Sequence, residues 1–286
     1  MTLIQHNIKD GIATVTFHNP PRGYMNAAQV QELDGVIDAL ADDRNVRVIV
    51  FTGGVPGVFI RHYDVAEIIS IAEIIRESGR TDEDLMADAL PGNAVSSLFD
   101  KVDRISKPTI AAINGFCQGG GFEFALCCDI RIAGHGDYRI GLPETNVGIF
   151  PGAGGTERLP RLIGEAKALE LILRGRTVDP EGALALGMVH EYVPDAMARA
   201  TEIAMELATR TPRALAEAKA LVKSAADRSL DEAGAISRSS RATRTPKPPC
   251  VAISTPARIS TSSDTMNGDK RAKWNVAVTC PIAPGF

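Results

Sequence analysis

The sequence predicts an α/β protein in which helices cover a sheet of mostly parallel strands. Short β-rich runs alternate with helical patterns through roughly the first two thirds of the 286 residues. Two of these runs, VRVIVFTGG (46–54) and PTIAAINGFC (108–117), are almost continuously apolar, as strands covered on both faces are. Because strands alternate with helices along the chain, we expect a layered fold with parallel pairing.

The first elements can be placed from periodicity and capping. GIATVTFHN (11–19) alternates like a strand, and Asn26 can cap the helix that follows. The segment 46–54 is the next strand, and residues 64–107 have a helical pattern that the polar GRTDED and the ALPGN segment interrupt. The first helix is predicted because its apolar positions follow a 3.6-residue period: Val30, Leu33, Val36, Ile37 and Leu40.

The second half follows the same logic. The buried strand 108–117 leads into a glycine turn and the apolar helix FEFALCCD, and then into the short strands DIRIAG and YRIGL. Asp179-Pro180 marks a helix start, because an aspartate cap precedes proline at the first helical position. Residues 195–227 predict two amphipathic helices that separate near Thr211-Pro212.

Composition and charge exclude several classes of protein. The chain is 44% hydrophobic and 23% charged, as ordinary globular proteins are, and its net charge of -4 gives no electrostatic case for binding nucleic acid or an acidic membrane. No apolar run approaches the length of a membrane span, and the start of the chain does not resemble a signal peptide. We therefore expect a cytoplasmic protein with reduced cysteines that lack zinc-type spacing: Cys117, Cys127, Cys128, Cys250 and Cys280.

The last segment, 239–286, differs from the rest of the chain. It is rich in Ser, Thr, Pro and Arg, and it carries seven basic and two acidic residues, a net of +5 that leaves -9 for the rest. No helical period is visible in it, so its composition favours a disordered or irregular tail over a folded unit.

The segment NGFCQGGGFEFALCCD (114–129) is the first candidate for chemistry. Three consecutive glycines are costly in backbone entropy, and a chain tolerates them where it turns sharply or approaches a ligand closely. Because they lead into a helix, the N–H groups near Gly120 form an environment for a negatively charged or polarised oxygen. A tight packing turn between strand and helix is the alternative.

Two glutamates are candidates for proton transfer. Glu123 lies in the first turn of the helix among apolar residues, where it either caps the helix or carries a proton; by itself the position favours capping. Glu144 lies beside a proline, between a short strand and a loop rich in Gly and Pro. It either faces a cleft or is a surface residue of a turn, and its neighbours alone leave both readings open.

Two long segments resolve these alternatives through a family resemblance. NGFCQGGGFEFALCCDIRIAG (114–134) and GLPETNVGIFPGAGGTERLPRLIG (141–164) resemble the signature region of the crotonase, or enoyl-CoA hydratase/isomerase, superfamily, closest to its enoyl-CoA hydratases. VRVIVFTGG, KPTIAAINGFC, MNAAQVQEL and LRGRTVDPEGALALGMVHEYVP support it, and the resemblance covers about residues 5–230.

The resemblance implies a fold and a domain organisation. We expect the crotonase-like spiral of repeated ββα units with a C-terminal helical region. The spiral core with the acyl-CoA site would occupy residues 1–195, the helical region 196–238 and the atypical tail 239–286. The family commonly forms trimers or dimers of trimers. The tail departs from the family pattern, which either a shifted reading frame near residue 237 or genuine divergence would explain.

The resemblance also assigns residues to the reaction centre. Glu123 and Glu144 match the two hydratase glutamates, and Gly152 matches a glycine lining the centre. The backbone N–H groups of Gly120 and Tyr63 match the oxyanion hole that polarises the thioester carbonyl. The chain departs from the family at this second donor, because His62 replaces the preceding glycine and Tyr63 is bulky.

Further residues match positions that contact the substrate. The segments PPRGYMN and YDVAE would bind the coenzyme A moiety, with Arg22 as a phosphate contact. The residues assigned to substrate and CoA binding are Arg22, Met25, Arg61, Asp64, Val65 and Gly152.

The implied reaction is hydration of a 2-enoyl-CoA to a 3-hydroxyacyl-CoA, in which two N–H donors stabilise enolate charge and the glutamates move protons. It requires no metal and no redox cofactor, and coenzyme A belongs to the substrate. The alternatives are isomerase, hydrolase or lyase chemistry on the same scaffold, or a crotonase-like binding protein without activity. The absence of a G-x-S-x-G elbow argues against a serine hydrolase.

Overall fold

A computed structural model describes residues 2–81, 83–84, 93–227, 229 and 232. The chain divides into two units, residues 1–233 and 234–286, and the first holds every element described below. The predicted tail 239–286 lies outside the described residues, as do Cys250 and Cys280. The predicted boundaries at 195 and 238 stay predictions.

The larger sheet combines one antiparallel hairpin with a parallel array. β1 and β2 are antiparallel, and every other pair of neighbours is parallel. The strand order is β1-β2-β3-β5-β7-β10, with β1 at Ile4–Lys9, β2 at Ile12–Phe17, β3 at Val48–Gly53, β5 at Thr109–Ile113, β7 at Ile130–Gly134 and β10 at Glu191–Val193.

A smaller sheet has the order β4-β6-β8-β9, with β4 at Val58–Ile60, β6 at Phe116–Gln118, β8 at Ile140–Gly141 and β9 at Thr177–Val178. The strands β3, β5 and β7 of the larger sheet are each followed by a strand of the smaller one, and helices follow each pair. This repeated ββα order confirms the predicted α/β spiral.

The predicted helices are present, including the two C-terminal ones, and two further helices, Gly155–Ile163 and Glu165–Leu173, lie in a segment for which the sequence predicts no helix. They are α1 (Ala27–Asp42), α2 (Val65–Glu77), α4 (Ala94–Arg104), α5 (Gly120–Cys127), α6 (Gly155–Ile163), α7 (Glu165–Leu173), α8 (Pro180–Leu186), α9 (Ala196–Ala208) and α10 (Pro212–Lys223), with 3₁₀ turns η1 (Glu144–Val147) and η2 (Ala225–Asp227). Asn26 and Asp179 cap α1 and α8 as predicted, since their side chains accept the N–H groups of Gln29 and Gly182.

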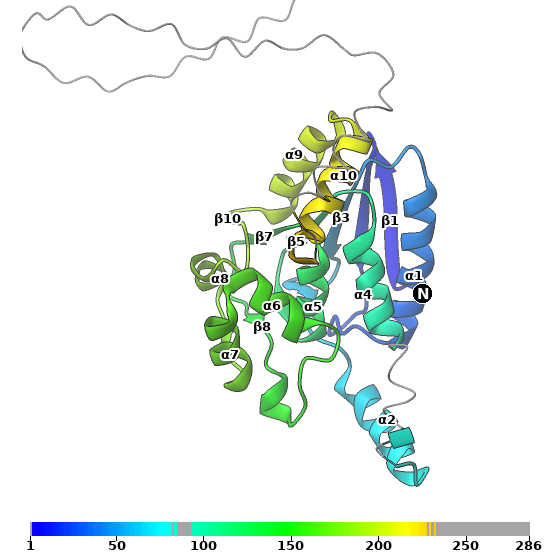
Figure 1. The fold of residues 1–286 in the computed structure, drawn as a ribbon, viewed down its shortest axis with the longest axis vertical. Coiled ribbons are helices and arrows are strands. Elements are labelled where there is room, and N and C mark those ends of the chain that lie inside the picture. Colours follow the sequence, from blue (N-terminus) through cyan, green and yellow to red (C-terminus); the bar gives the residue numbers. More distant parts are fainter. Residues whose placement is uncertain (1, 82, 85–92, 228, 230–231, 233–286) are drawn as a thin grey trace, which may run out of the picture. The chain divides into compact units, whose positions relative to one another are not determined.

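Each face of the larger sheet has its own core. α9 packs on β3, β5 and β7 through a stripe of buried alanines, Ala196, Ala200 and Ala204, whose small side chains let the helix approach closely. In Figure 1, α9 lies on one side of the strands and α1 on the other.

Phe124 fixes the helix that carries Glu123. Its ring contacts four others, with centroids 5.0 Å away at Phe51, 5.1 Å at Phe17, 5.5 Å at Phe99 and 6.5 Å at Phe59. Aromatic pairs of this kind contribute about 0.5–1.5 kcal/mol each beyond their buried area. The ring cluster therefore anchors α5 against β2, β3, β4 and α4.

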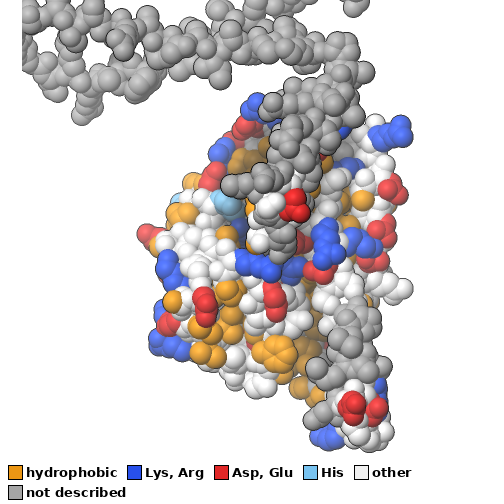
Figure 2. Space-filling view, viewed as in Figure 1, with side chains coloured by type: hydrophobic (Ala, Val, Ile, Leu, Met, Phe, Trp, Pro, Cys, Tyr) orange, Lys and Arg blue, Asp and Glu red, His pale blue; other side chains and the backbone are white. Residues whose placement is uncertain are grey.

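Two parts of the described surface remain apolar. No residue of α2 is buried, and Ile69, Ile71 and Ile74 are more than half exposed. Figure 2 shows hydrophobic side chains gathered on the face over α6 and α7, where Leu169 and Leu173 are 48% and 70% exposed. None of the helices in the described part of the chain has the length and apolar character of a membrane span.

Candidate active site

The glycine turn before α5 has the geometry that its sequence predicts. Gly119 has a φ of 51°, in the region that favours glycine, and its N–H donates to Gly141 O at 2.9 Å, which ties the turn to β8. A Cβ on Gly121 would lie 2.1 Å from the carbonyl oxygen of Ile60, so no side chain fits there. The turn thus packs its backbone directly against β4, the strand before Tyr63.

The two predicted oxyanion-hole residues lie side by side. A Cβ built on Gly120 would lie 3.3 Å from Tyr63 Cβ and 3.5 Å from Tyr63 N. A bridge holds the Tyr63 segment, in which Met25 N–H donates to His62 O at 2.9 Å and Asp64 N–H donates to Met25 O at 2.8 Å. Neither Gly120 N–H nor Tyr63 N–H has an acceptor within the part of the chain that the structure describes. Two unused backbone donors therefore adjoin each other.

The side chain of Tyr63 is tethered to two helices. Its hydroxyl donates to Glu67 Oε2 at 2.9 Å, and the same oxygen accepts the N–H of Ala27 at 2.9 Å. Partial burial, and then the Glu67 carboxylate, raise the pKa of Tyr63 far above its usual value, so the phenol stays a neutral donor.

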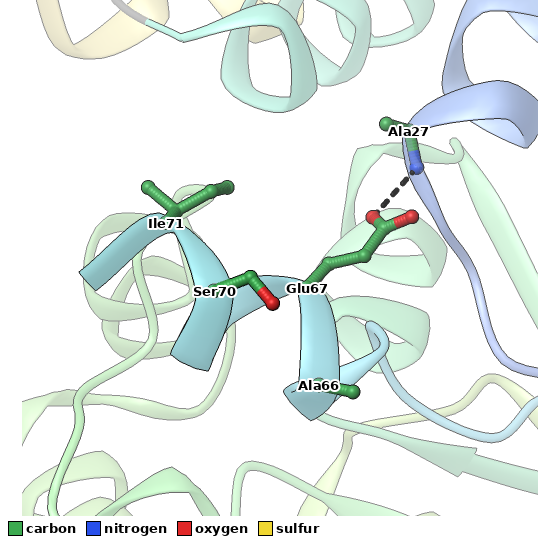
Figure 3. Close-up of a pocket in the computed structure, with 5 residues that line it drawn as sticks. All are labelled: Ala27, Ala66, Glu67, Ser70 and Ile71. Atoms are coloured by element: carbon green, nitrogen blue, oxygen red, sulfur yellow. Dashed lines mark hydrogen bonds between the residues drawn. The ribbon is translucent and has the colours of Figure 1, made fainter. Parts of the chain in front are cut away.

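A cavity of about 380 Å³ lies beside this tether, between the start of α1 and α2. Figure 3 shows Glu67 reaching across it to Ala27, with the other lining residues on α2. Its lining consists of Ala27, Ala66, Glu67, Ser70 and Ile71, so neither Glu123 nor Glu144 faces it.

Glu123 is buried and held by a turn thirty residues further along the chain. The residue is 3% exposed, and its Oε1 accepts the N–H groups of Ala153 at 2.8 Å and Gly155 at 2.9 Å. Burial raises the pKa of Glu123, while these two N–H groups and the Arg158 guanidinium oppose the rise because they favour the charged form. The two N–H donors thus offset part of the cost of removing the Glu123 carboxylate from water.

Glu144 is buried without such compensation. The residue is 9% exposed, and neither of its carboxylate oxygens has a hydrogen-bond partner among the described residues. Its Oε1 lies 3.4 Å from where a Cβ on Gly119 would be, which places the carboxylate against the glycine turn. Burial, and then the charge of Glu123, raise the pKa of Glu144 to about 7. A buried, unpartnered carboxylate of this kind is costly and is typical of functional sites.

The glutamates form a pair with different environments. The charge of Glu123 raises the pKa of Glu144, and the Glu144 carboxylate lies against the glycine turn that leads into the Glu123 helix. Burial raises the pKa of both residues, but two N–H groups and Arg158 favour the charged form of Glu123, whereas Glu144 has no hydrogen-bond partner among the described residues. The pair can therefore accept one proton and donate another beside two backbone N–H donors.

The residues predicted to bind coenzyme A fall into separate groups. Arg22 lies 5.8 Å from the centroid of the Tyr24 ring, which stacks on His62 with centroids 4.3 Å apart. Arg61 lies 4.5 Å from the centroid of the Phe116 ring, and its Nε donates to Arg22 O at 3.1 Å. The structure therefore brings the two predicted arginines together next to the Tyr63 segment.

The other predicted contacts have different surroundings. Asp64 caps α2 through the N–H of Ala66 at 2.9 Å, and Val65 is the first residue of that helix. Gly152 is exposed in the loop before α6, far along the chain from the other residues predicted to bind coenzyme A. Met25 is 0% exposed in the core, and both its backbone groups are bonded. This burial leaves Met25 no surface for a ligand, and the geometry gives its predicted contact with coenzyme A no support.

Three site residues are not predicted from the sequence. Ala153 and Gly155 supply the N–H groups that hold Glu123, and Arg158 bonds the same turn through Ala153 O at 3.0 Å. The glycines of PGAGG indicate a site wall, but no sequence signal identifies a backbone donor thirty residues from its acceptor. Within the described ranges, no three His, Cys, Asp or Glu side chains are grouped to hold a metal ion.

The chain is similar to known proteins over most of its length. The sequence model of the family described as enoyl-CoA hydratase/isomerase matches residues 7–243. A probable enoyl-CoA hydratase of Bacillus subtilis is 36% identical over 219 residues, which cover 76% of this chain and 80% of that protein. The mitochondrial enoyl-CoA hydratase domain-containing protein 2 of Bos taurus is 37% identical over 228 residues, 77% of this chain and 71% of its own.

A solved structure shows the same fold. The crystal structure of an enoyl-CoA hydratase from Bacillus anthracis superposes with a TM-score of 0.72 at 29% identity, and the match covers 84% of this chain and 90% of that one. The family match spans most of the chain, and the two relatives named above are aligned over 80% and 71% of their own length. The chain therefore belongs to the enoyl-CoA hydratase/isomerase family of enzymes, in the crotonase superfamily, close to the enoyl-CoA hydratases.

Proposed function

We propose that this enzyme is an enoyl-CoA hydratase, which adds water across the C2=C3 bond of a 2-enoyl-CoA to give a 3-hydroxyacyl-CoA. The observation that carries the proposal is the buried glutamate pair, in which two N–H groups support Glu123 and no described residue bonds Glu144. Hydration needs one group that takes a proton from water and another that gives a proton to carbon. Two carboxylates with different proton affinities meet this need.

The proposed roles follow from these environments. Glu123, as the carboxylate, deprotonates a water molecule that both glutamates hold, and the oxygen attacks C3. Glu144, protonated near neutral pH because its pKa is raised to about 7, donates its proton to C2. The negative charge that develops on the thioester oxygen between these events is stabilised by the N–H groups of Gly120 and Tyr63. Removal of one such donor costs about 3–4 kcal/mol in known oxyanion holes.

The proposed reaction uses an acyl-CoA thioester and needs no other bound group. An acyl-CoA thioester is the substrate, with Arg22 and Arg61 near the oxyanion segment as candidates for its phosphate groups. No metal or redox cofactor takes part in the proposed steps. Assembly into a trimer or a dimer of trimers and a cytoplasmic location stay predictions.

A screen of enoyl-CoA esters tests the proposal. Hydration removes the double bond conjugated to the thioester, so the conjugated-thioester absorbance should fall when crotonyl-CoA or longer trans-2-enoyl-CoA esters are added. Mass spectrometry of the product should show a gain of one water. The matched sample is Glu123→Gln at the same concentration, which should leave the absorbance unchanged on the same timescale.

The product separates hydration from the other reactions of the scaffold. Isomerisation gives a product of unchanged mass, and hydrolysis releases free coenzyme A, which a thiol reagent detects. Either product in place of the 3-hydroxyacyl-CoA would contradict the proposal. A protein that binds the esters without converting any of them would be a binding protein instead.

A further inference from the structure

The support of Glu123 depends on one short turn before α6. Ala153 and Gly155 donate the two N–H groups that the Glu123 carboxylate accepts, and both bonds go to the same oxygen, Oε1. A shift of this turn would change the position of the carboxylate and remove its donors. Whatever holds the turn therefore also holds Glu123.

The side chain of Arg158 bonds that turn directly. Its Nη1 donates to Ala153 O at 3.0 Å, and its backbone N–H donates to Gly154 O at 2.9 Å. The carbonyl oxygen of Ala153 thus accepts a hydrogen bond from the guanidinium, while the N–H of Ala153 donates to Glu123. One residue of the turn connects the cation to the carboxylate.

The turn contains a glycine where the guanidinium passes. A Cβ on Gly154 would lie 1.9 Å from Arg158 Nη1 and 3.0 Å from Cζ, and Gly154 has a φ of 99°. A side chain at this position would collide with the guanidinium and strain the backbone. The local sequence therefore accommodates Arg158 as part of the turn.

Arg158 is itself anchored on another helix. Its Nη2 bonds Asp100 Oδ1 at 2.6 Å, and its Nε lies 3.8 Å from Asp103 Oδ2, both on α4. The side chain is 14% exposed, which reduces screening by solvent. Lys223 of α10 also pairs with Asp103. The cation is thus fixed between the turn and α4.

The charge of this cation acts on Glu123. The charge of Arg158 favours the ionised form of Glu123 against the cost of burial, while no cation supports Glu144. The charged groups facing Glu123 come from three elements: Glu144 of η1, Glu157 and Arg158 of α6, and, through Arg158, Asp100 and Asp103 of α4.

We propose that Arg158 is a positioning residue for the reaction, which holds the turn of residues 153–155 and through it the Glu123 carboxylate. The inference rests on the proposed function, in which Glu123 is the base. Arg158 does not touch the substrate; it acts through Ala153 and through its charge. Small displacements of a catalytic group can cost about 100-fold in rate.

The test compares Arg158→Met and Arg158→Lys with Arg161→Met, which removes an exposed arginine of the same helix. Arg158→Met should lower kcat by at least about 10-fold with KM changed by less than about threefold, because ground-state binding does not involve the turn. The loss of the cation raises the pKa of Glu123, so the acidic limb of the kcat profile should move to higher pH. Arg158→Lys should keep that limb closer to the wild-type position, and Arg161→Met should match the wild type.

A purely structural role predicts other results. A folded Arg158→Met variant with a lower melting temperature but the wild-type kcat and pH profile would overturn the inference. If Arg158→Met does not fold, Arg158→Lys decides. A fall in its kcat at unchanged KM supports the inference, since an ammonium cannot reproduce the bonds to Ala153 and Asp100 together, whereas a wild-type kcat overturns it.

Glu123→Gln in the same assay separates this inference from the proposed function. If Glu123→Gln retains the wild-type rate, Glu123 is not the base and the proposed function fails. If Glu123→Gln is inactive while Arg158→Met is unchanged, only the role of Arg158 fails.

Discussion

Glu123 and Glu144 lie in one buried site with opposite hydrogen bonding. One oxygen of Glu123 accepts two backbone N–H groups, and neither oxygen of Glu144 accepts a hydrogen bond from the described residues. Both residues lie against Gly119, because its O accepts the Glu123 N–H at 2.9 Å and a Cβ built on it would lie 3.4 Å from Glu144 Oε1. The fold thus gives two identical side chains different hydrogen-bonding environments.

The first prediction concerns the pH dependence of the rate. Glu144 must carry a proton to act as the acid, and its pKa is raised to about 7. The kcat/KM of the free enzyme should therefore fall as pH rises above about 7, with an apparent pKa that belongs to the interacting pair. A profile measured from pH 6 to 9 with crotonyl-CoA checks this. A flat profile over that range would exclude Glu144 as the acid.

The second prediction concerns stability. Glu144 has a pKa of about 7 in the folded protein against an ordinary value of 4.5, so the folded state binds more protons between these pH values. Stability therefore decreases as pH rises through this window, by about 3 kcal/mol in total. Glu144→Gln removes this loss. The free energy of unfolding of the variant, relative to that of the wild type, should therefore be higher at pH 8 than at pH 5.

Urea unfolding at pH 5 and pH 8 measures this gain. Glu181→Gln, at an exposed glutamate of α8, is the matched control and should follow the wild type at both pH values. A difference between Glu144→Gln and the wild type that is the same at both pH values would show that Glu144 is ionised in the folded protein throughout.

The fold was largely predictable because its elements carry local signals. β3 and β5 are entirely or almost entirely buried and have continuous apolar runs, and capping residues mark the starts of α1 and α8. β1 was not predicted, because only Ile4 of its six residues is buried and the strand has no alternating pattern. Asp10 and Gly11, both with positive φ, form the turn to β2 and were an unused hairpin signal.

The run 108–117 shows a second limit of sequence reasoning. It was interpreted as one strand, but it forms β5 of the larger sheet and β6 of the smaller sheet. The strand pairing is interrupted at Gly115, where a Cβ would lie 1.9 Å from the backbone of Gly57. This contact joins residues that are distant in sequence, so apolar character alone could not reveal it.

The sequence predicts only part of the site, because some of its contacts join residues that are distant along the chain. The glycine turn and the two glutamates were found through motifs, and the structure places them together. The bonds from the turn to Glu123, and the pairing of Arg158 with Asp100 of α4, are contacts across thirty residues or more. Met25 is buried, and its backbone forms a bridge with Tyr63 that no local pattern indicates.

The third prediction compares the two sides of the oxyanion hole. Gly120→Pro removes an N–H at the first position of α5, where proline is tolerated by a helix, and should lower kcat at least about 100-fold. Tyr63→Ala keeps its backbone N–H and should retain kcat within about 10-fold, although loss of the hydroxyl bond to Glu67 should cost about 1 kcal/mol of stability. Circular dichroism confirms that both variants fold.

The two variants test different parts of the proposed oxyanion hole. A folded Gly120→Pro enzyme with the wild-type kcat would remove the Gly120 N–H from the mechanism. A loss of activity in folded Tyr63→Ala as large as that in Gly120→Pro would mean that the Tyr63 side chain, rather than its backbone alone, takes part in catalysis.

The most direct test of the account is kcat for crotonyl-CoA hydration by Glu123→Gln, Glu144→Gln and the double variant. Each single substitution removes one proton-transfer group and should lower kcat by at least about 100-fold. Because the two carboxylates act on one water, the double variant should fall far short of the product of the single effects. A Glu144→Gln enzyme that hydrates crotonyl-CoA at nearly the wild-type rate would contradict the paired mechanism.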